Sequence, residues 1–124
     1  MNTVLWILQI VLAVVFAGAG AVKLIAPRDQ LAKTLGGWVY DVPAWLPKPL
    51  GVAELLGAIG LIVPPLVHIA PILTPIAASA LAVTMIGAIV VHARRGEFAN
   101  VAVNVVLAVM AAVVAWGRFG PYAF

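Results

Sequence analysis

The sequence predicts an all-α protein, an integral membrane four-helix antiparallel bundle, and three observations lead to this class. Hydrophobic residues make up 65% of the 124 residues and charged residues only 9%, which is too little polar surface for a soluble domain. Four apolar stretches approach the roughly 20 residues that a membrane-spanning helix needs. Nearly every charged or strongly polar residue falls at one end of such a stretch. Residues 1–124 are therefore expected to form one domain in contact with the lipid bilayer of the cell membrane.

The first helix is expected over residues 3–25, because Pro27 disfavours helical conformation at the residue before it. No Lys or Arg precedes its apolar run, and the run exceeds the ~7 to 15 residues of a secretory signal, so we interpret it as a retained span. A polar connector that contains prolines and tryptophans follows over residues 26–48.

The second helix is expected over residues 49–63. Pro49 suits a first helical turn, where its missing N–H would be unpaired in any case, and Pro64 with Pro65 should end the helix. About 15 residues rising ~1.5 Å each span only about 22 Å, which is short for a bilayer. We therefore expect a shielded turn over residues 64–71.

The third and fourth helices are expected over residues 72–93 and 98–116, joined by a tight loop at residues 94–97. The first and third loops contain most of the basic side chains: Arg28, Lys33, Lys48, Arg94 and Arg95. The opposite side has only Arg118. Because cytoplasmic loops carry an excess of Lys and Arg, loops 26–48 and 94–97 are predicted to be cytoplasmic and both termini to lie outside.

Antiparallel threading places five polar residues at one depth near the cytoplasmic face: Lys23, Glu54, His92, Asn100 and Asn104. An ionisable side chain within a span costs about 2.5–3.5 kcal/mol, so Glu54 needs a partner, a proton or water. Lys23 is its natural partner. We interpret the pair either as a structural tie, with Lys23 extended toward the interface, or as a proton-handling or anion-binding pair.

The other members of this cluster also allow two interpretations each. His92 is either an interfacial helix cap or a group that bonds a ligand carbonyl or relays protons. Asn100 and Asn104, one turn apart, either join helices or contact a ligand. His68 lies in the opposite loop, which excludes bis-histidine haem ligation within one chain. No standard metal-ligand spacing is present, so no metal site is predicted.

The connector places three aromatic residues among turn formers: Trp38, Tyr40 and Trp45. They are expected either to form an aromatic belt at the headgroup level or to cover the polar cluster as a lid with a lateral entrance. The chain has no cysteine, which excludes thiolate and iron–sulfur chemistry. Its seven basic residues form no basic stripe, so nucleic acid is not a predicted partner.

Two sequence motifs and two single residues resemble a known family. The segments 16–23 (FAGAGAVK) and 51–57 (GVAELLG), together with His92 and Asn104, resemble the DoxX and DoxX-like membrane proteins. The resemblance implies a four-helix membrane bundle often found alongside oxidoreductases, with relatives that include the quinone-linked membrane subunit of thiosulfate oxidation. Carried over to this chain, it implies four candidate site residues: Lys23, Glu54, His92 and Asn104.

These observations favour a small membrane subunit that binds a quinone or similar lipid-soluble ligand at the polar cluster and supports a membrane or peripheral oxidoreductase. No cofactor is expected within the chain apart from such a bound quinone or lipid. The alternative is an assembly scaffold for a larger membrane complex, in which the polar cluster only locks the bundle. A transporter is the third hypothesis, and it would require a homo-oligomer because four helices enclose little volume.

Overall fold

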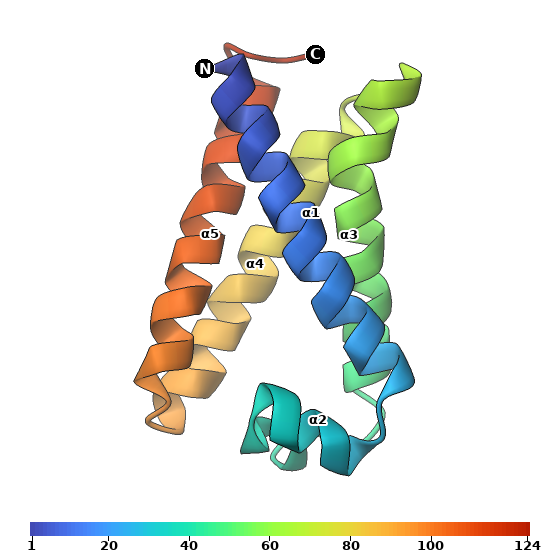
Figure 1. Cartoon of the computed structure of the whole chain (residues 1–124). Coiled ribbons are helices and arrows are strands. Elements are labelled where there is room, and N and C mark those ends of the chain that lie inside the picture. Colours follow the sequence, from blue (N-terminus) through green and yellow to red (C-terminus); the bar gives the residue numbers. More distant parts are fainter.

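The computed structural model describes residues 1–124 and contains helices and no strands. The elements are α1 (Asn2–Ile25), α2 (Arg28–Leu35), the short 3₁₀ helix η1 (Gly37–Tyr40), α3 (Pro47–Val67), α4 (Leu73–Arg94) and α5 (Phe98–Phe119). The helices α1, α3, α4 and α5 are long and apolar enough to cross a membrane, and they alternate in direction (Figure 1). The prediction of an all-α antiparallel bundle of membrane-spanning helices is confirmed.

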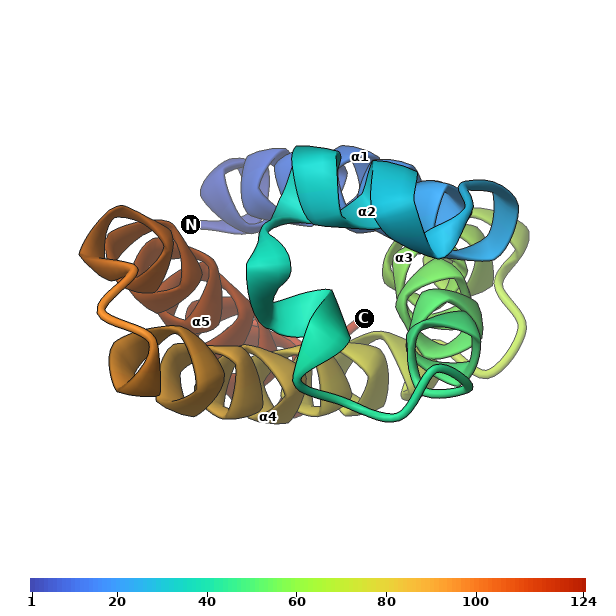
Figure 2. The ribbon, with the colours of Figure 1, turned by 90° about the horizontal axis from the view of Figure 1, so that it is seen from below.

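The four long helices form a closed ring, in which α1 packs on α3, α3 on α4, α4 on α5, and α5 on α1. Near the chain termini α1 and α5 touch, since Leu5 packs on Gly117 there, and they diverge toward the other end (Figure 1). At that other end α2 and η1 lie across the bundle (Figure 2). We call residues 28–42 the lid, and we call the two ends of the bundle the lid end and the terminal end.

Ten apolar side chains form the buried core between the long helices: Leu5, Leu12, Phe16, Ala58, Leu61, Ala78, Leu81, Met85, Ala111 and Val114. Large apolar side chains on the outer faces, such as Val14, Ile59 and Val83, remain exposed. In a bilayer these faces contact lipid, which is as apolar as they are. Association of the helices therefore depends on close packing of small residues more than on hydrophobic burial.

The helices α1 and α3 approach each other closely at Gly20 and Gly51. A Cβ atom built on either glycine would lie 2.7 Å from the carbonyl oxygen of the other. Any larger residue would push the two backbones apart. Because Lys23 and Glu54 each follow one of these glycines by three residues, the close approach also brings their side chains together.

Gly51→Ala is expected to lower the free energy of unfolding by about 1–3 kcal/mol, because the added methyl group overlaps the backbone of α1. Gly18→Ala is the matched control, since a Cβ at Gly18 meets nothing within 4 Å. Unfolding by SDS in mixed micelles, followed by circular dichroism, measures both. Equal stability of the two variants would contradict the close approach of α1 and α3.

The helix α3 extends beyond its predicted end. It continues through Pro64 and Pro65 to Val67, and the turn to α4 is correspondingly short, residues 68–72. The expected end at Val63 is therefore wrong. Proline inside a helix removes one backbone hydrogen bond and leaves the carbonyl oxygen four residues earlier without a partner.

Both of the carbonyl groups freed by these prolines are bonded again by neighbouring helices. The hydroxyl of Thr74 in α4 donates to the carbonyl oxygen of Gly60 at 2.9 Å. The side-chain amide of Gln9 in α1 donates to the carbonyl oxygen of Leu61 at 2.7 Å. A full-length span with two internal prolines is stable because these side chains replace the lost donors.

The connector predicted over residues 26–48 is largely helical, since it contains α2 and η1. The guanidinium group of Arg28 donates to the carbonyl oxygens of Val39 and Val42, at 3.2 and 3.3 Å, and so folds η1 back onto α2. The other spans match the prediction closely. Among them, α5 extends further than expected and ends at Phe119, and α3 also begins earlier than the predicted residue 49, at Pro47.

Candidate ligand pocket

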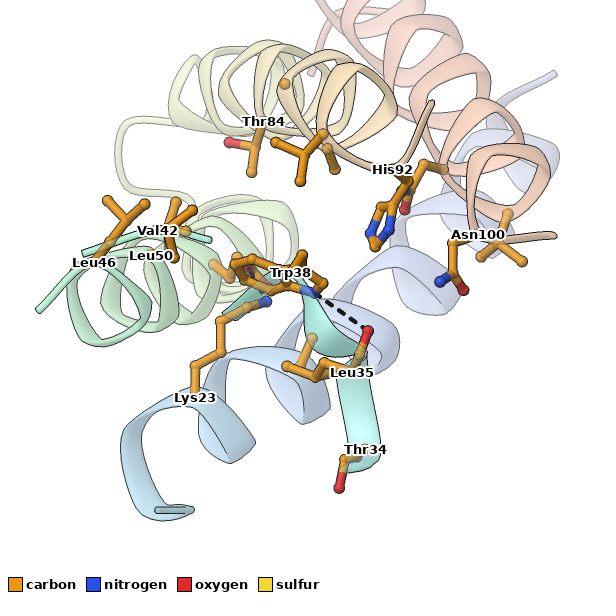
Figure 3. Close-up of a pocket in the computed structure, with 17 residues that line it drawn as sticks. Lys23, Thr34, Leu35, Trp38, Val42, Leu46, Leu50, Thr84, His92 and Asn100 are labelled. Atoms are coloured by element: carbon orange, nitrogen blue, oxygen red, sulfur yellow. Dashed lines mark hydrogen bonds and ion pairs between the residues drawn. The ribbon is translucent and has the colours of Figure 1, made fainter. Parts of the chain in front are cut away.

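A cavity of about 530 Å³ lies within the bundle at the lid end, bounded by all four long helices and by the lid. Six of the eight predicted site residues line it: Lys23, Trp38, Glu54, His92, Asn100 and Asn104. The side chains of Lys23, Trp38, His92 and Asn100 extend into this region from four different elements (Figure 3). Apolar side chains such as Leu35, Leu50 and Val91 supply much of the remaining wall. The structure thus brings six of these residues together.

Lys23 and Glu54 form a buried ion pair in the wall of the pocket. The Nζ atom of Lys23 lies 2.6 Å from Oε1 of Glu54, and the two side chains are only 10% and 3% exposed. Each charge offsets the other inside an apolar bundle, where either one alone would be costly. The natural partner that the sequence suggested for Glu54 is therefore the observed one.

The helix α5 contributes two amides to the pocket, Asn100 and Asn104. The Nδ2 atom of Asn104 is buried and has no hydrogen-bond partner. Leaving a buried amide donor unpaired costs about 1–3 kcal/mol. Asn104 therefore carries a polar group for which the protein itself provides no partner.

His92, in the last turn of α4, is held by a carboxylate that sequence analysis did not single out. Its Nδ1 atom lies 3.0 Å from Oε1 of Glu97. Gly96 between them has φ of 72°, a left-handed conformation that glycine adopts without strain. The chain therefore turns sharply enough for the N–H of Glu97 to donate to the carbonyl oxygen of His92 at 2.9 Å.

Glu97 also links His92 to the lid. Its Oε1 atom accepts a hydrogen bond from Nε of Arg95 at 3.1 Å, and Arg95 in turn forms an ion pair with Asp41 of the lid. The hydrogen bond from His92, assisted by the charge of Arg95, lowers the pKa of the Glu97 carboxyl. The hydrogen bond to Asp41 raises the pKa of the Arg95 guanidinium. A continuous polar chain therefore runs from the pocket wall to the lid.

Trp38 is the aromatic residue of the lid that covers the pocket. Its Nε1 donates to the carbonyl oxygen of Leu35 at 3.2 Å, which fixes the ring (Figure 3). The ring also stands edge-on to His92, with 6.3 Å between the two centroids. The pocket therefore has an aromatic wall next to its imidazole group.

Tyr40 and Trp45, the other two aromatic residues predicted for the site, do not line the pocket. Both are exposed, Trp45 by 66%. The hydroxyl of Tyr40 donates to Asp29 at 2.6 Å, and this hydrogen bond raises the pKa of Tyr40. Tyr40 therefore joins η1 to α2 at the outer surface of the lid.

A second buried polar cluster lies at the terminal end, where sequence analysis predicted none. Arg118 is only 2% exposed, and its guanidinium donates to Gln9 Oε1 at 2.8 Å, Asn2 Oδ1 at 2.7 Å and the carbonyl oxygen of Tyr122 at 2.9 Å. Its Nη2 atom has no partner, and its guanidinium carbon lies over the ring of Phe124, 4.0 Å from the ring centroid. This cluster joins α1, α5 and the C-terminal segment. A lone glutamine in an apolar span was the available signal.

No group of three or more His, Cys, Asp or Glu side chains is placed to hold a metal ion. His68 caps the C-terminus of α3 at the terminal end, and His92 ends α4 at the lid end. The two imidazole groups therefore lie at opposite ends of the bundle, as the sequence predicted.

The comparisons with known proteins agree with this architecture. The model of the DoxX-like family matches residues 7–114, a segment that includes Lys23, Glu54, His92 and Asn104. No curated protein and no solved structure matches the chain. Four spans in the structure and a family match over most of the chain make this a multi-pass membrane protein. The chain belongs to the DoxX-like family.

Proposed function

We propose that this protein is a small membrane subunit that binds a quinone, or a similar lipid-soluble molecule with a carbonyl-bearing head, in the pocket at the lid end. One observation carries the proposal: a cavity with largely apolar walls gathers the hydrogen-bonding side chains of His92, Asn100 and Asn104 from two helices. A few polar groups in an otherwise apolar pocket are the arrangement that orients the polar head of a lipid-soluble molecule.

The size and shape of the pocket suit such a molecule. Its volume of about 530 Å³ lies within the roughly 300–1,000 Å³ typical of small-molecule sites. The ring of Trp38 offers a wall for a flat head group. Ala19 of α1 and Val103 of α5 both line the cavity. The helices α1 and α5 diverge toward the lid end (Figure 1). An aliphatic tail would leave between them into the bilayer.

The distribution of basic residues favours one orientation of the protein and one side for its partner. The basic loops favour a cytoplasmic lid end, which would place the head group within reach of a protein on that side. The resemblance to DoxX proteins supports a membrane or peripheral oxidoreductase as this partner. In this arrangement the partner supplies the electrons, and the subunit binds and orients the quinone.

Filling the pocket should weaken binding without disturbing the fold. Gly87 lines the cavity, and a Cβ there meets nothing within 4 Å, so Gly87→Leu extends into open space. We expect Gly87→Leu to raise the Kd of a short-tail benzoquinone about tenfold or more, since overpacking costs about 1–3 kcal/mol. Quenching of tryptophan fluorescence in phosphatidylcholine nanodiscs measures the Kd.

Gly18→Leu is the matched control, because Gly18 also has open space but lies outside the pocket. It should bind the quinone as the natural sequence does. Trp38→Phe should remove most of the saturable quenching, since Trp38 alone among the four tryptophans lines the cavity. Absence of saturable quenching in the natural sequence would contradict the proposal and favour a scaffold role.

A further inference from the structure

The two ring nitrogens of His92 face different surroundings. Nδ1 lies 3.0 Å from Glu97, whose side chain is 24% exposed at the surface of the lid end. Nε2 makes no hydrogen bond to the protein and is not sealed in its interior. The ring itself lines the cavity beside Trp38 (Figure 3). His92 is therefore the one group that connects the pocket to a surface carboxylate.

The hydrogen-bond network assigns the tautomer of His92. Glu97 is ionised at neutral pH, because its pKa is lowered by the hydrogen bond from His92 and by the charge of Arg95. A carboxylate accepts hydrogen bonds and cannot donate them, so the proton of the neutral imidazole resides on Nδ1. The unprotonated Nε2 then presents a lone pair to the cavity. Nε2 is therefore a hydrogen-bond acceptor that a ligand hydroxyl group can reach.

We propose that His92 accepts the proton of a phenol- or quinol-type hydroxyl group on the bound ligand, and that Glu97 is the positioning residue behind it. This inference rests on the proposed function and extends it to the reduced, hydroxyl-bearing form of the ligand. The O–H bond of the ligand breaks, its electron pair stays on the oxygen, and a new N–H bond forms at Nε2. The Nδ1 proton can then pass to Glu97 and to water.

The charges around His92 suit this transfer. From the loop between α4 and α5, Glu97 is well placed to balance the positive charge that protonation of the ring creates. Arg95 contacts Glu97 and is itself paired with Asp41 of the lid. Across the pocket, Lys23 and Glu54 are paired with each other. Lys23 lines the same cavity, so its ammonium group can stabilise the ligand oxyanion.

The test uses a probe whose ionisation is visible, a 2-alkyl-4-nitrophenol, with the full chain in phosphatidylcholine nanodiscs. The absorbance of the nitrophenolate is recorded against pH. We expect binding to lower the apparent pKa of the probe by about one unit relative to empty nanodiscs. His92→Gln should remove this shift, and Glu97→Gln should reduce it. Ser79→Ala should keep it, since Ser79 lies outside the pocket and its hydroxyl is bonded to Pro75 within α4.

Quenching of Trp38 by the benzoquinone, measured on every variant, shows that the pocket is intact. A probe pKa that is unshifted, or a shift that survives His92→Gln or is lost only in Glu54→Gln, would overturn this inference while quinone binding stands. Binding of the quinone without binding of the nitrophenol would also overturn it. If neither molecule binds to the natural sequence, both this inference and the proposed function fail.

Discussion

Lys23→Met is expected to lower the free energy of unfolding by about 3–5 kcal/mol, because it leaves the carboxylate of Glu54 buried without its partner. The side chain of Glu54 is 3% exposed, so water offers little compensation. Glu54→Gln should lower the free energy of unfolding by a smaller amount, because the charge that it leaves unpaired can reach the membrane surface. Lys23 lies in the last turn of α1, from which a long side chain can extend to the interface. Unfolding by SDS in mixed micelles measures both variants.

The double variant Lys23→Met/Glu54→Leu separates the two interpretations of this pair. Replacing both charges by apolar groups of similar size should restore stability to within about 1 kcal/mol of the natural sequence. If the double variant also binds the benzoquinone normally, the pair is a structural tie. If the double variant is stable but binds the benzoquinone more than about tenfold more weakly, the ion pair takes part in ligand binding. A double variant no more stable than Lys23→Met would contradict the buried ion pair.

The sequence was sufficient to predict the gathering of the polar helical residues, because a bilayer restricts where chain segments can lie. Antiparallel spans fix the depth of each residue, so Lys23, Glu54, His92 and Asn104 had to share one level. Small residues on α1 and α3 then determined which faces meet. Depth and small-residue packing together are enough to place helical side chains in a membrane bundle.

The lid could not be predicted to the same degree. Trp38, Tyr40 and Trp45 have similar local surroundings in the sequence, yet only Trp38 lines the pocket. The distinction depends on how Arg28 folds η1 back through its bonds to backbone carbonyl groups. Glu97 was missed for a related reason, since its contact with His92 depends on a left-handed glycine between them. Such tertiary and turn contacts leave no periodic pattern in a single sequence.

The end of α3 was predicted wrongly because local rules for proline ignored the neighbouring helices. Taken alone, Pro64 and Pro65 end a helix, and the rule holds wherever no other donor reaches the freed carbonyl groups. Here Thr74 and Gln9 reach them. The prolines, the glutamine and the arginine bonded to it therefore form one unit of structure, although they are far apart in the sequence.

Gln9→Leu is expected to lower the free energy of unfolding by about 3 kcal/mol or more, because two buried groups lose their partners together. The carbonyl oxygen of Leu61 loses its donor at 2.7 Å, and the Nε of Arg118 loses its acceptor at 2.8 Å. Leucine fills a similar volume, so the loss reports the hydrogen bonds more than the packing. SDS unfolding in mixed micelles provides the measurement.

A second substitution tests the role of the proline itself. Pro65→Ala restores an N–H group at residue 65, which can bond the carbonyl oxygen of Leu61 within α3. In the Gln9→Leu background, Pro65→Ala should therefore recover about 1–2 kcal/mol, whereas in the natural sequence it should recover little, because Gln9 already occupies that oxygen. The loss of stability that Pro65→Ala does not recover reflects the Nε of Arg118, which remains without its acceptor. Equal effects of Pro65→Ala in both backgrounds would contradict the view that Gln9 compensates for the proline, and the continuation of α3 would then need another cause.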